Sequence, residues 1–283
     1  MATTTQVAAP ARAHTPIALW HLLSLDAPTV AALWTWFIAR ACRIHLPIVA
    51  PIGMFVAVWI LYAADRLLDT RRLDAAYDRR FVPDELEERH LFHHGHRRAF
   101  RTGIALATAA LAALLPHLNA EAIHLYLVEG ALLIGWFLLL HSSSDARHLP
   151  KELAVGVFFA PAVFIPTIAR QPGSSFALIP SAILLAALCT LNCLFIHAWE
   201  DNLPAGRSPW RHLQLLAVLL VIASVACFLL PFDTVWPLQA ACGIAAFCLL
   251  TLHLTRRHLS RIHLRAAADL ALLTPLLLLP FLR

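Results

Sequence analysis

The sequence predicts an all-α, polytopic membrane protein with about nine transmembrane helices, and three observations support this fold class. Of the 283 residues, 60% are hydrophobic and only 14% are charged, whereas a soluble domain carries roughly a quarter charged residues. The apolar residues fall into segments of about 17 to 25 residues, the length that crosses the hydrocarbon core. The 18 prolines outnumber the 9 glycines, and membrane helices tolerate proline because neighbouring groups satisfy the freed carbonyls.

The chain divides into an N-terminal tail with an interfacial segment, residues 1–26, and a transmembrane domain, residues 27–283. A cytoplasmic loop is expected at residues 69–99, where charged residues replace the apolar run. The Ala/Thr-rich start of the chain lacks an apolar core followed by a cleavage site, so we expect no removed signal peptide. The predicted spans are residues 27–44, 48–68, 100–118, 121–140, 151–169, 176–198, 212–230, 234–254 and 266–282.

Basic residues in alternate connections predict the orientation. The connections after the second, fourth, sixth and eighth spans are rich in arginine, and those after the third and seventh carry no Lys or Arg. Cytoplasmic connections carry this excess, so we expect the N-terminus in the cytoplasm. The expected location is a bacterial-type inner membrane. Arg40 and Arg43, at the far end of the first span, fit this orientation less well. The net charge of +5 is therefore explained by the basic residues that fix the orientation of the protein in the membrane. We expect membrane lipids as partners and no nucleic acid.

Two carboxylates end the second predicted span. Asp65 and Asp69 are four residues apart, so both project from one helix face. Acids at the end of an apolar span are costly to bury unless they are neutralised, and Mg²⁺ does this while bridging to substrate phosphates. The alternative interpretation is that they pair with Arg66, Arg71 and Arg72 at the water boundary.

A second acidic group ends the sixth predicted span on the same side of the membrane. His197 is followed by Glu200 and Asp201, and Asn192 lies one to two turns earlier. A polar side chain within a span is expected to face the bundle interior. Two acidic helix ends beside basic loops favour a site for a phosphorylated lipid, in which a metal holds the diphosphate. The alternative is an ordinary helix end with an acidic cap.

This layout resembles the UbiA superfamily of membrane prenyltransferases, which have nine helices and Asp-rich motifs after the second and sixth spans. The first motif of that family reads N-D-x-x-D-x-x-x-D, and the second contains D-x-x-x-D. Asp65 and Asp69 match the last two acids of the first motif, whereas Leu61 and Tyr62 stand where Asn and Asp are expected. In the second motif Asp201 matches one acid and His197 stands at the other.

The resemblance implies Mg²⁺-dependent transfer of a prenyl group from a prenyl diphosphate to a lipophilic acceptor, such as an aromatic ring. It implies catalytic roles for Asp65, Asp69, Glu200 and Asp201, with His197 joining Asp65, Asp69 and Asp201 as metal ligands. The basic residues would offset the diphosphate charge, and Glu129 would contact the acceptor. The substrate-binding residues expected on this basis are Arg71, Arg72, Arg147, Lys151, Tyr62, Asn192 and Glu129.

Two other functions remain open at this point. His90, His93 and His94 are spaced like one histidine box of the membrane di-iron oxygenases, and imidazole suits iron. No third box is visible, and a short basic histidine tract also fits headgroup contact or helix packing. The second alternative is a non-catalytic protein of the UbiA-like fold that binds an isoprenoid, because about half of the expected carboxylates are missing.

Overall fold

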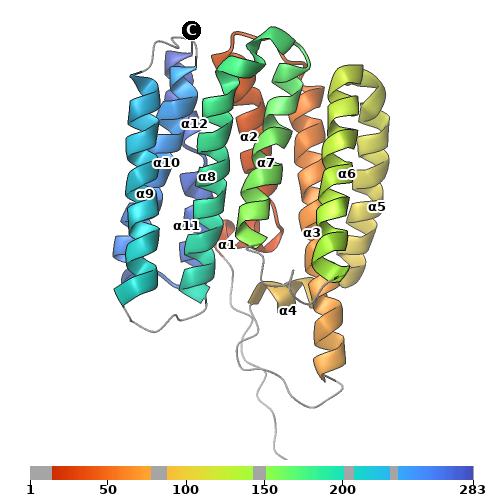
Figure 1. Ribbon diagram of the computed structural model, residues 1–283. Helices are drawn as coiled ribbons and strands as arrows, with labels where there is room; N and C mark the ends of the chain where they lie inside the picture. Colours follow the sequence, from red (N-terminus) through yellow and green to blue (C-terminus); the bar gives the residue numbers. More distant parts are fainter. Residues whose placement is uncertain (1–14, 78–87, 143–150, 201–206, 230–234, 283) are drawn as a thin grey trace, which may run out of the picture.

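The computed structural model describes residues 15–77, 88–142, 151–200, 207–229 and 235–282, and all regular structure in them is helical (Figure 1). This confirms the predicted all-α class. In chain order the α-helices are α1 Pro16–Leu22, α2 Asp26–Ala41, α3 Val49–Tyr77, α4 Glu88–Gly95, α5 Arg97–Leu114, α6 Ala120–Ser142, α7 Lys151–Ile168, α8 Ser175–Glu200, α9 Arg207–Phe228, α10 Trp236–Thr255, α11 Arg261–Ala271 and α12 Pro275–Leu278.

The long helices are apolar enough to identify a multi-pass membrane protein. Among the described residues, six helical segments have the length and apolarity needed to cross a bilayer. The number becomes seven if α1 and α2, which meet at 88°, are counted as one bent span. Every predicted span is helical over most of its length, but α2 has only 16 residues, which is close to the lower limit for crossing the hydrocarbon.

Large apolar side chains cover the outside of the bundle. On α5 and α6, Leu106, Leu127 and Leu132 are each more than 60% exposed. A soluble monomer rarely leaves such a continuous apolar surface in water, whereas in a bilayer these side chains would meet lipid chains as apolar as themselves. The outer surface therefore agrees with the hydropathy of the sequence.

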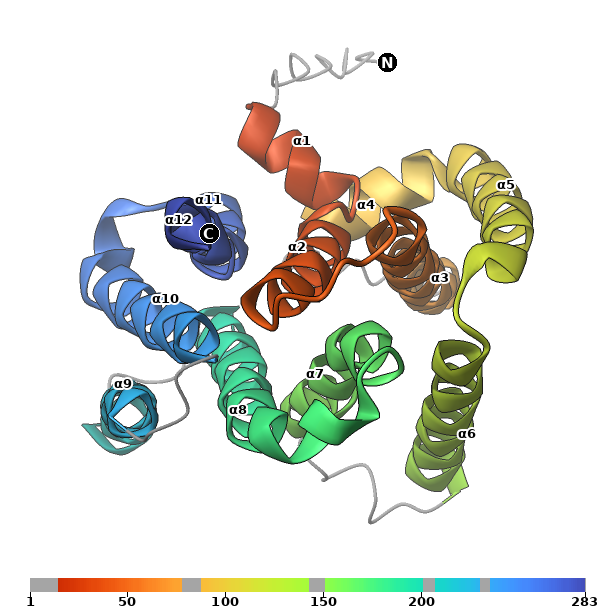
Figure 2. The same ribbon diagram turned by 90° about the horizontal axis from the view of Figure 1, so that it is seen from above.

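The helices surround α2, which packs against α3, α7 and α11 (Figure 2). α8 packs against α7, α9 and α10, and α10 in turn contacts α11. Trp34 and Phe37 of α2 are fully buried in this core, and the Trp34 indole Nε1 donates to the Leu272 carbonyl at 2.9 Å. The first and last apolar segments of the chain are thereby joined in the middle of the bundle.

The polar segment predicted as a loop, residues 69–99, contains helical structure. α3 continues past its apolar part to Tyr77, and α4 covers Glu88–Gly95. The sequence between Arg66 and Tyr77 has no proline or glycine, so nothing in it stops the helix where the apolar run ends. α4 packs against α1, α3 and α5 at this end of the bundle.

Gly156 allows α7 and α8 to approach closely. A Cβ atom added at Gly156 would collide with the Thr190 side chain and the Ala186 carbonyl, both on α8. The carbonyl belongs to the helix backbone and has little freedom to move. The sequence therefore needs a residue without a side chain here if the two helices are to pack as they do.

The first prediction concerns this contact. Gly156→Ala is expected to lower the free energy of unfolding by about 1–3 kcal/mol, because overpacking forces the two helices apart. Thermal unfolding in detergent would measure this as a lower Tm. Gly130→Ala on α6 is the matched control, since a Cβ there meets no atom within 4 Å. An equal Tm for both variants would show that α7 and α8 do not need the close approach.

Candidate functional site

Buried polar groups gather at the end of the bundle where α1 meets α2, which is the lower end in Figure 1. His21 ends α1, Asp26 begins α2, and Asp269 lies on α11. Within the described residues, these are the three His, Cys, Asp or Glu side chains that come close enough together to hold a metal ion, with ligand atoms within 4.8 Å of one another. His21 and Asp26 are buried, and the Asp269 side chain is 16% exposed; we call the three residues the buried triad.

The buried triad is connected by short polar contacts. His21 Nδ1 lies 2.5 Å from Asp26 Oδ2 and 3.9 Å from Asp269 Oδ2. Asn192 on α8 donates from Nδ2 to Asp269 Oδ1 at 3.1 Å, so a fourth helix reaches the cluster. His21, Asp26 and Asn192 are each about 5% exposed, and the site is closed to bulk water on these sides.

The turn between α1 and α2 brings His21 to Asp26. α1 starts at a Thr15 cap, whose Oγ1 accepts from the Ala18 amide at 3.3 Å, with Pro16 in its first turn. The helix stops at Ser24, which has a left-handed φ of 55°, a conformation that costs roughly 1 kcal/mol outside glycine. α2 then begins with Asp26, and an acid at a helix N-terminus is favoured by the helix dipole.

Charge at the triad is balanced by groups from several helices. Arg66 of α3 lies within electrostatic range of Asp26, and Arg265 of α11 lies within electrostatic range of Asp269. α1 lies outside the six long apolar helices, and there burial lowers the pKa of the His21 imidazole below its usual value, although the hydrogen bond with Asp26 acts in the opposite direction.

The predicted site residues Asp65 and His197 lie at this same end of the bundle. Asp65 is exposed on α3, and His197 is exposed on α8 with its Nδ1 3.9 Å from Glu152 Oε1 of α7. α2 and α7 lie between α3 and α8 when the bundle is viewed along its axis (Figure 2). Asp65 and His197 are thus separated by two helices. The residue that lies beside His197 is Glu152, which was not among the predicted site residues.

Three further predicted residues are inside the bundle or at its wall. Asn192 is buried, as expected for a polar side chain within a span, and it contacts Asp269. Tyr62 packs against the main hydrophobic core, within electrostatic range of Asp26 and Asp269. Glu129 on α6 is half-buried, and its Oε1 is buried without a hydrogen-bond partner.

The remaining predicted residues are only partly covered by the structure. Asp69, Arg71, Arg72, Lys151 and Glu200 belong to α3, α7 or α8, but their side chains lie outside the described part of the chain. Arg147 and Asp201 lie outside the described residues altogether.

Sequence reasoning missed His21, Asp26 and Asp269. Asp269 carried a usable signal, because it is an acid inside the predicted span 266–282 and intramembrane acids are functional by default. His21 and Asp26 lie in or next to the expected interfacial segment, where polar residues are ordinary. Their meeting with Asp269 depends on the packing of α11 against α1 and α2.

The histidine-rich segment packs against the bundle. His93 is 1% exposed, and its ring stacks on Phe100 with centroids 4.1 Å apart. Its Nε2 lies 3.3 Å from the Ser24 hydroxyl, at the turn that joins α1 to α2. His96 Nδ1 lies 2.9 Å from the Phe92 carbonyl. These contacts agree with helix packing, the interpretation that competed with a di-iron box.

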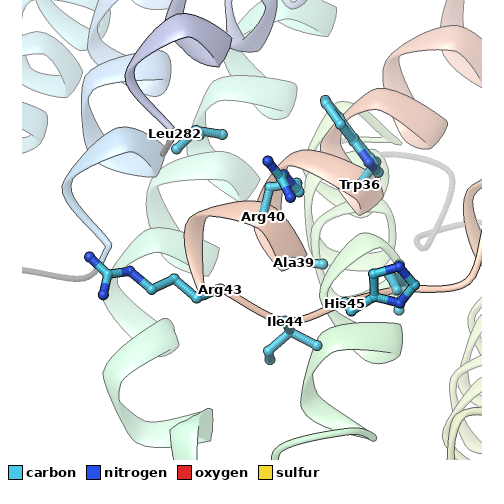
Figure 3. A pocket seen from close by; sticks show the side chains of 8 residues that line it. Trp36, Ala39, Arg40, Arg43, Ile44, His45 and Leu282 are labelled. Carbon is cyan, nitrogen blue, oxygen red and sulfur yellow. The ribbon is translucent and has the colours of Figure 1, made fainter.

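A separate hollow of about 530 Å³ lies at the opposite end of α2, lined in part by Trp36, Arg40, Arg43, His45 and Leu282. In Figure 3 the Arg40 and Arg43 side chains point away from each other. These cations do not converge on one point, so the hollow is a weaker candidate for a charged ligand than the polar end.

Comparison with known proteins adds no relative. No family model, no curated protein and no solved structure matches the chain.

The second prediction tests the role of His93. His93→Ala is expected to lower the free energy of unfolding by about 1–2 kcal/mol, because it removes the ring stacking and the hydrogen bond to Ser24. His93→Phe, which keeps an aromatic ring over Phe100, should recover part of the Tm. Iron that co-purifies with the wild type and is lost in His93→Ala would instead support the di-iron alternative.

Proposed function

We propose that this protein is a UbiA-like membrane prenyltransferase with a nine-span bundle and its polar end in the cytoplasm. It would transfer a prenyl group from a prenyl diphosphate to a lipophilic acceptor. The observation that carries the proposal is the position of Asp65 on α3 and His197 on α8, two exposed residues far apart in the sequence. Asp65 precedes Arg66, which lies within electrostatic range of Asp26. His197 lies five residues after Asn192, which contacts Asp269, so both residues are near the same polar end of the bundle.

The two parts of this substrate have different needs, and the chain offers a region for each. The diphosphate is highly charged and has to stay near water, where exposed Asp65 and His197 lie. The prenyl chain is apolar and has to lie among helices or lipid. Exposed leucines along α5 and α6 show that apolar surface continues from the polar end along the bundle.

The donor chemistry of the polar end fits Mg²⁺. Asp65 and Glu152 would supply carboxylate oxygens, the ligands that this hard cation prefers. Asp69 follows Asp65 by one helical turn, and Glu200 and Asp201 follow His197 in the sequence. His197, whose Nδ1 lies 3.9 Å from Glu152 Oε1, would orient that carboxylate. When bound, Mg²⁺ would neutralise the negative charge that develops on the departing diphosphate.

The chain's own residues would position the reactants. Arg71, Arg72, Arg147 and Lys151 would hold the diphosphate through charge-assisted hydrogen bonds while the bond between its oxygen and the allylic carbon breaks. The resulting carbocation would need a site without water, which the apolar interior around Tyr62 offers. Glu129, with its buried Oε1 unpaired, would accept a hydrogen bond from a hydroxyl of the acceptor. The acceptor would then form a bond to the carbocation and lose a proton to the released diphosphate.

The third prediction tests the ionising site. Detergent-purified protein, incubated with Mg²⁺ and a panel of radiolabelled prenyl diphosphates, is expected to release pyrophosphate. Asp65→Asn should lower this rate by at least about 100-fold, because it removes one of the charges that would hold the metal. Glu121→Gln is the control variant: Glu121 is exposed and lies beside the Asn119 turn, at the start of α6.

A wild type that binds prenyl diphosphate without releasing pyrophosphate would contradict the proposal. If Asp65→Asn then bound the same compound equally well, the non-catalytic, isoprenoid-binding alternative would be the better account. Equal release rates for Asp65→Asn and Glu121→Gln would show that the reaction does not depend on Asp65.

A further inference from the structure

We propose that His21, Asp26, Asp269 and Asn192 form a closed binding site for one divalent transition-metal ion, such as Zn²⁺ or Mn²⁺. This site goes beyond the proposed function and does not depend on it. Its donors come from α1, α2, α8 and α11, whereas Asp65 and Glu152 lie on α3 and α7. α8 carries residues of both sites, with buried Asn192 in this one and exposed His197 in the other.

The distances between donors suit a single ion after a small rearrangement. Metal–ligand bonds of about 2.1 Å in a tetrahedral site place the donor atoms about 3.4 Å apart. His21 Nδ1 and Asp269 Oδ2 are 3.9 Å apart, and His21 Nδ1 and Asp26 Oδ2 are 2.5 Å apart. Rotation of the Asp26 side chain would open the shorter pair by about 1 Å, and all three donor atoms already lie within 4.8 Å of one another.

Charge favours a cation at this position. Asp26 and Asp269 bring two carboxylates together inside an apolar bundle, and like charges that close raise the free energy of both. Arg66 offsets part of the charge of Asp26, and Arg265 offsets part of the charge of Asp269. A divalent ion between the carboxylates would neutralise both through direct bonds.

Asn192 gives an independent indication of a ligand. It is 95% buried, since its exposed fraction is 5%, and its Nδ2 already donates to Asp269 Oδ1. Its other polar atom, Oδ1, is buried and has no hydrogen-bond partner. An unpaired amide oxygen in the interior costs about 1–3 kcal/mol, and an ion held by the adjacent carboxylate would give this atom a partner.

The mixture of donors selects the class of metal. One imidazole with carboxylate and amide oxygens suits Zn²⁺ or Mn²⁺, whereas Mg²⁺ and Ca²⁺ are usually held by oxygen ligands. With four protein donors no position remains for a substrate, as in structural metal sites. The bound ion would fix the N-terminal helix α1 to the last apolar segment of the chain.

The fourth prediction tests this site with the full-length protein in detergent. After treatment with a chelator, the protein is titrated with Zn²⁺ or Mn²⁺ against a competing indicator, and bound metal is counted by mass spectrometry. The wild type is expected to bind about one ion per chain and to show a higher Tm with it. Asp269→Asn, which keeps the size of the side chain, should weaken binding at least about 10-fold and abolish the Tm increase.

Asp65→Asn is the matched control because it removes a carboxylate at the same end of the bundle outside this site. It should bind Zn²⁺ like the wild type even if it loses pyrophosphate release, so failure of the metal site and failure of the proposed function give different results. Wild-type protein that binds neither metal, or Asp269→Asn with unchanged affinity, would overturn the proposal.

A second variant keeps the test decisive if Asp269→Asn does not fold. Asn192→Asp adds a third carboxylate to the site and should tighten Zn²⁺ or Mn²⁺ binding, because the adjacent amide oxygen becomes a charged donor. Unchanged affinity in this variant would show that Asn192 does not reach the ion. Displacement of bound Zn²⁺ by an equal concentration of Mg²⁺ would overturn the assignment to a transition metal.

Discussion

The contact between Asp26 and Asp269 is the constraint on which the polar end of this bundle depends. Two carboxylates from the first and last apolar segments lie together in a protein whose outer surface is covered by apolar side chains. Removal of a group that compensates a buried charge leaves that charge unpaired, and the protein loses about 3–5 kcal/mol of stability. The helices that carry His21 and Asn192 therefore have to reach this point, and α1 has to turn back against α2 at 88°.

The tertiary structure around this contact serves to hold its partners in place. Ser24 adopts the left-handed conformation that ends α1, and its hydroxyl lies beside the buried His93 ring. α4, whose sequence resembles a metal-binding tract, thus supports the turn that delivers His21. On the other side, the close packing of α7 and α8 at Gly156 fixes the helix that carries Asn192.

Hydropathy predicted most of the fold, because the length of an apolar run largely determines where a membrane helix lies. It failed where a helix continues into polar sequence, as α3 does to Tyr77. It found Asn192, since a polar residue inside a span has to face the interior. It could not find the triad, because spacing arguments compare residues on one helix and His21, Asp26 and Asp269 meet only through the packing of α1, α2 and α11.

Two sets of polar residues lie at this end of the bundle, the exposed Asp65 and His197 and the buried triad, and their different exposure suits them to different roles. A diphosphate has to enter and leave in every reaction cycle, and an exposed group such as Asp65 can receive it with a small desolvation cost. A buried group exchanges its ligand slowly, and it favours a cation that stays bound through folding and function. α3 connects the two groups, because Asp65 is exposed on it and the next residue, Arg66, lies within electrostatic range of Asp26.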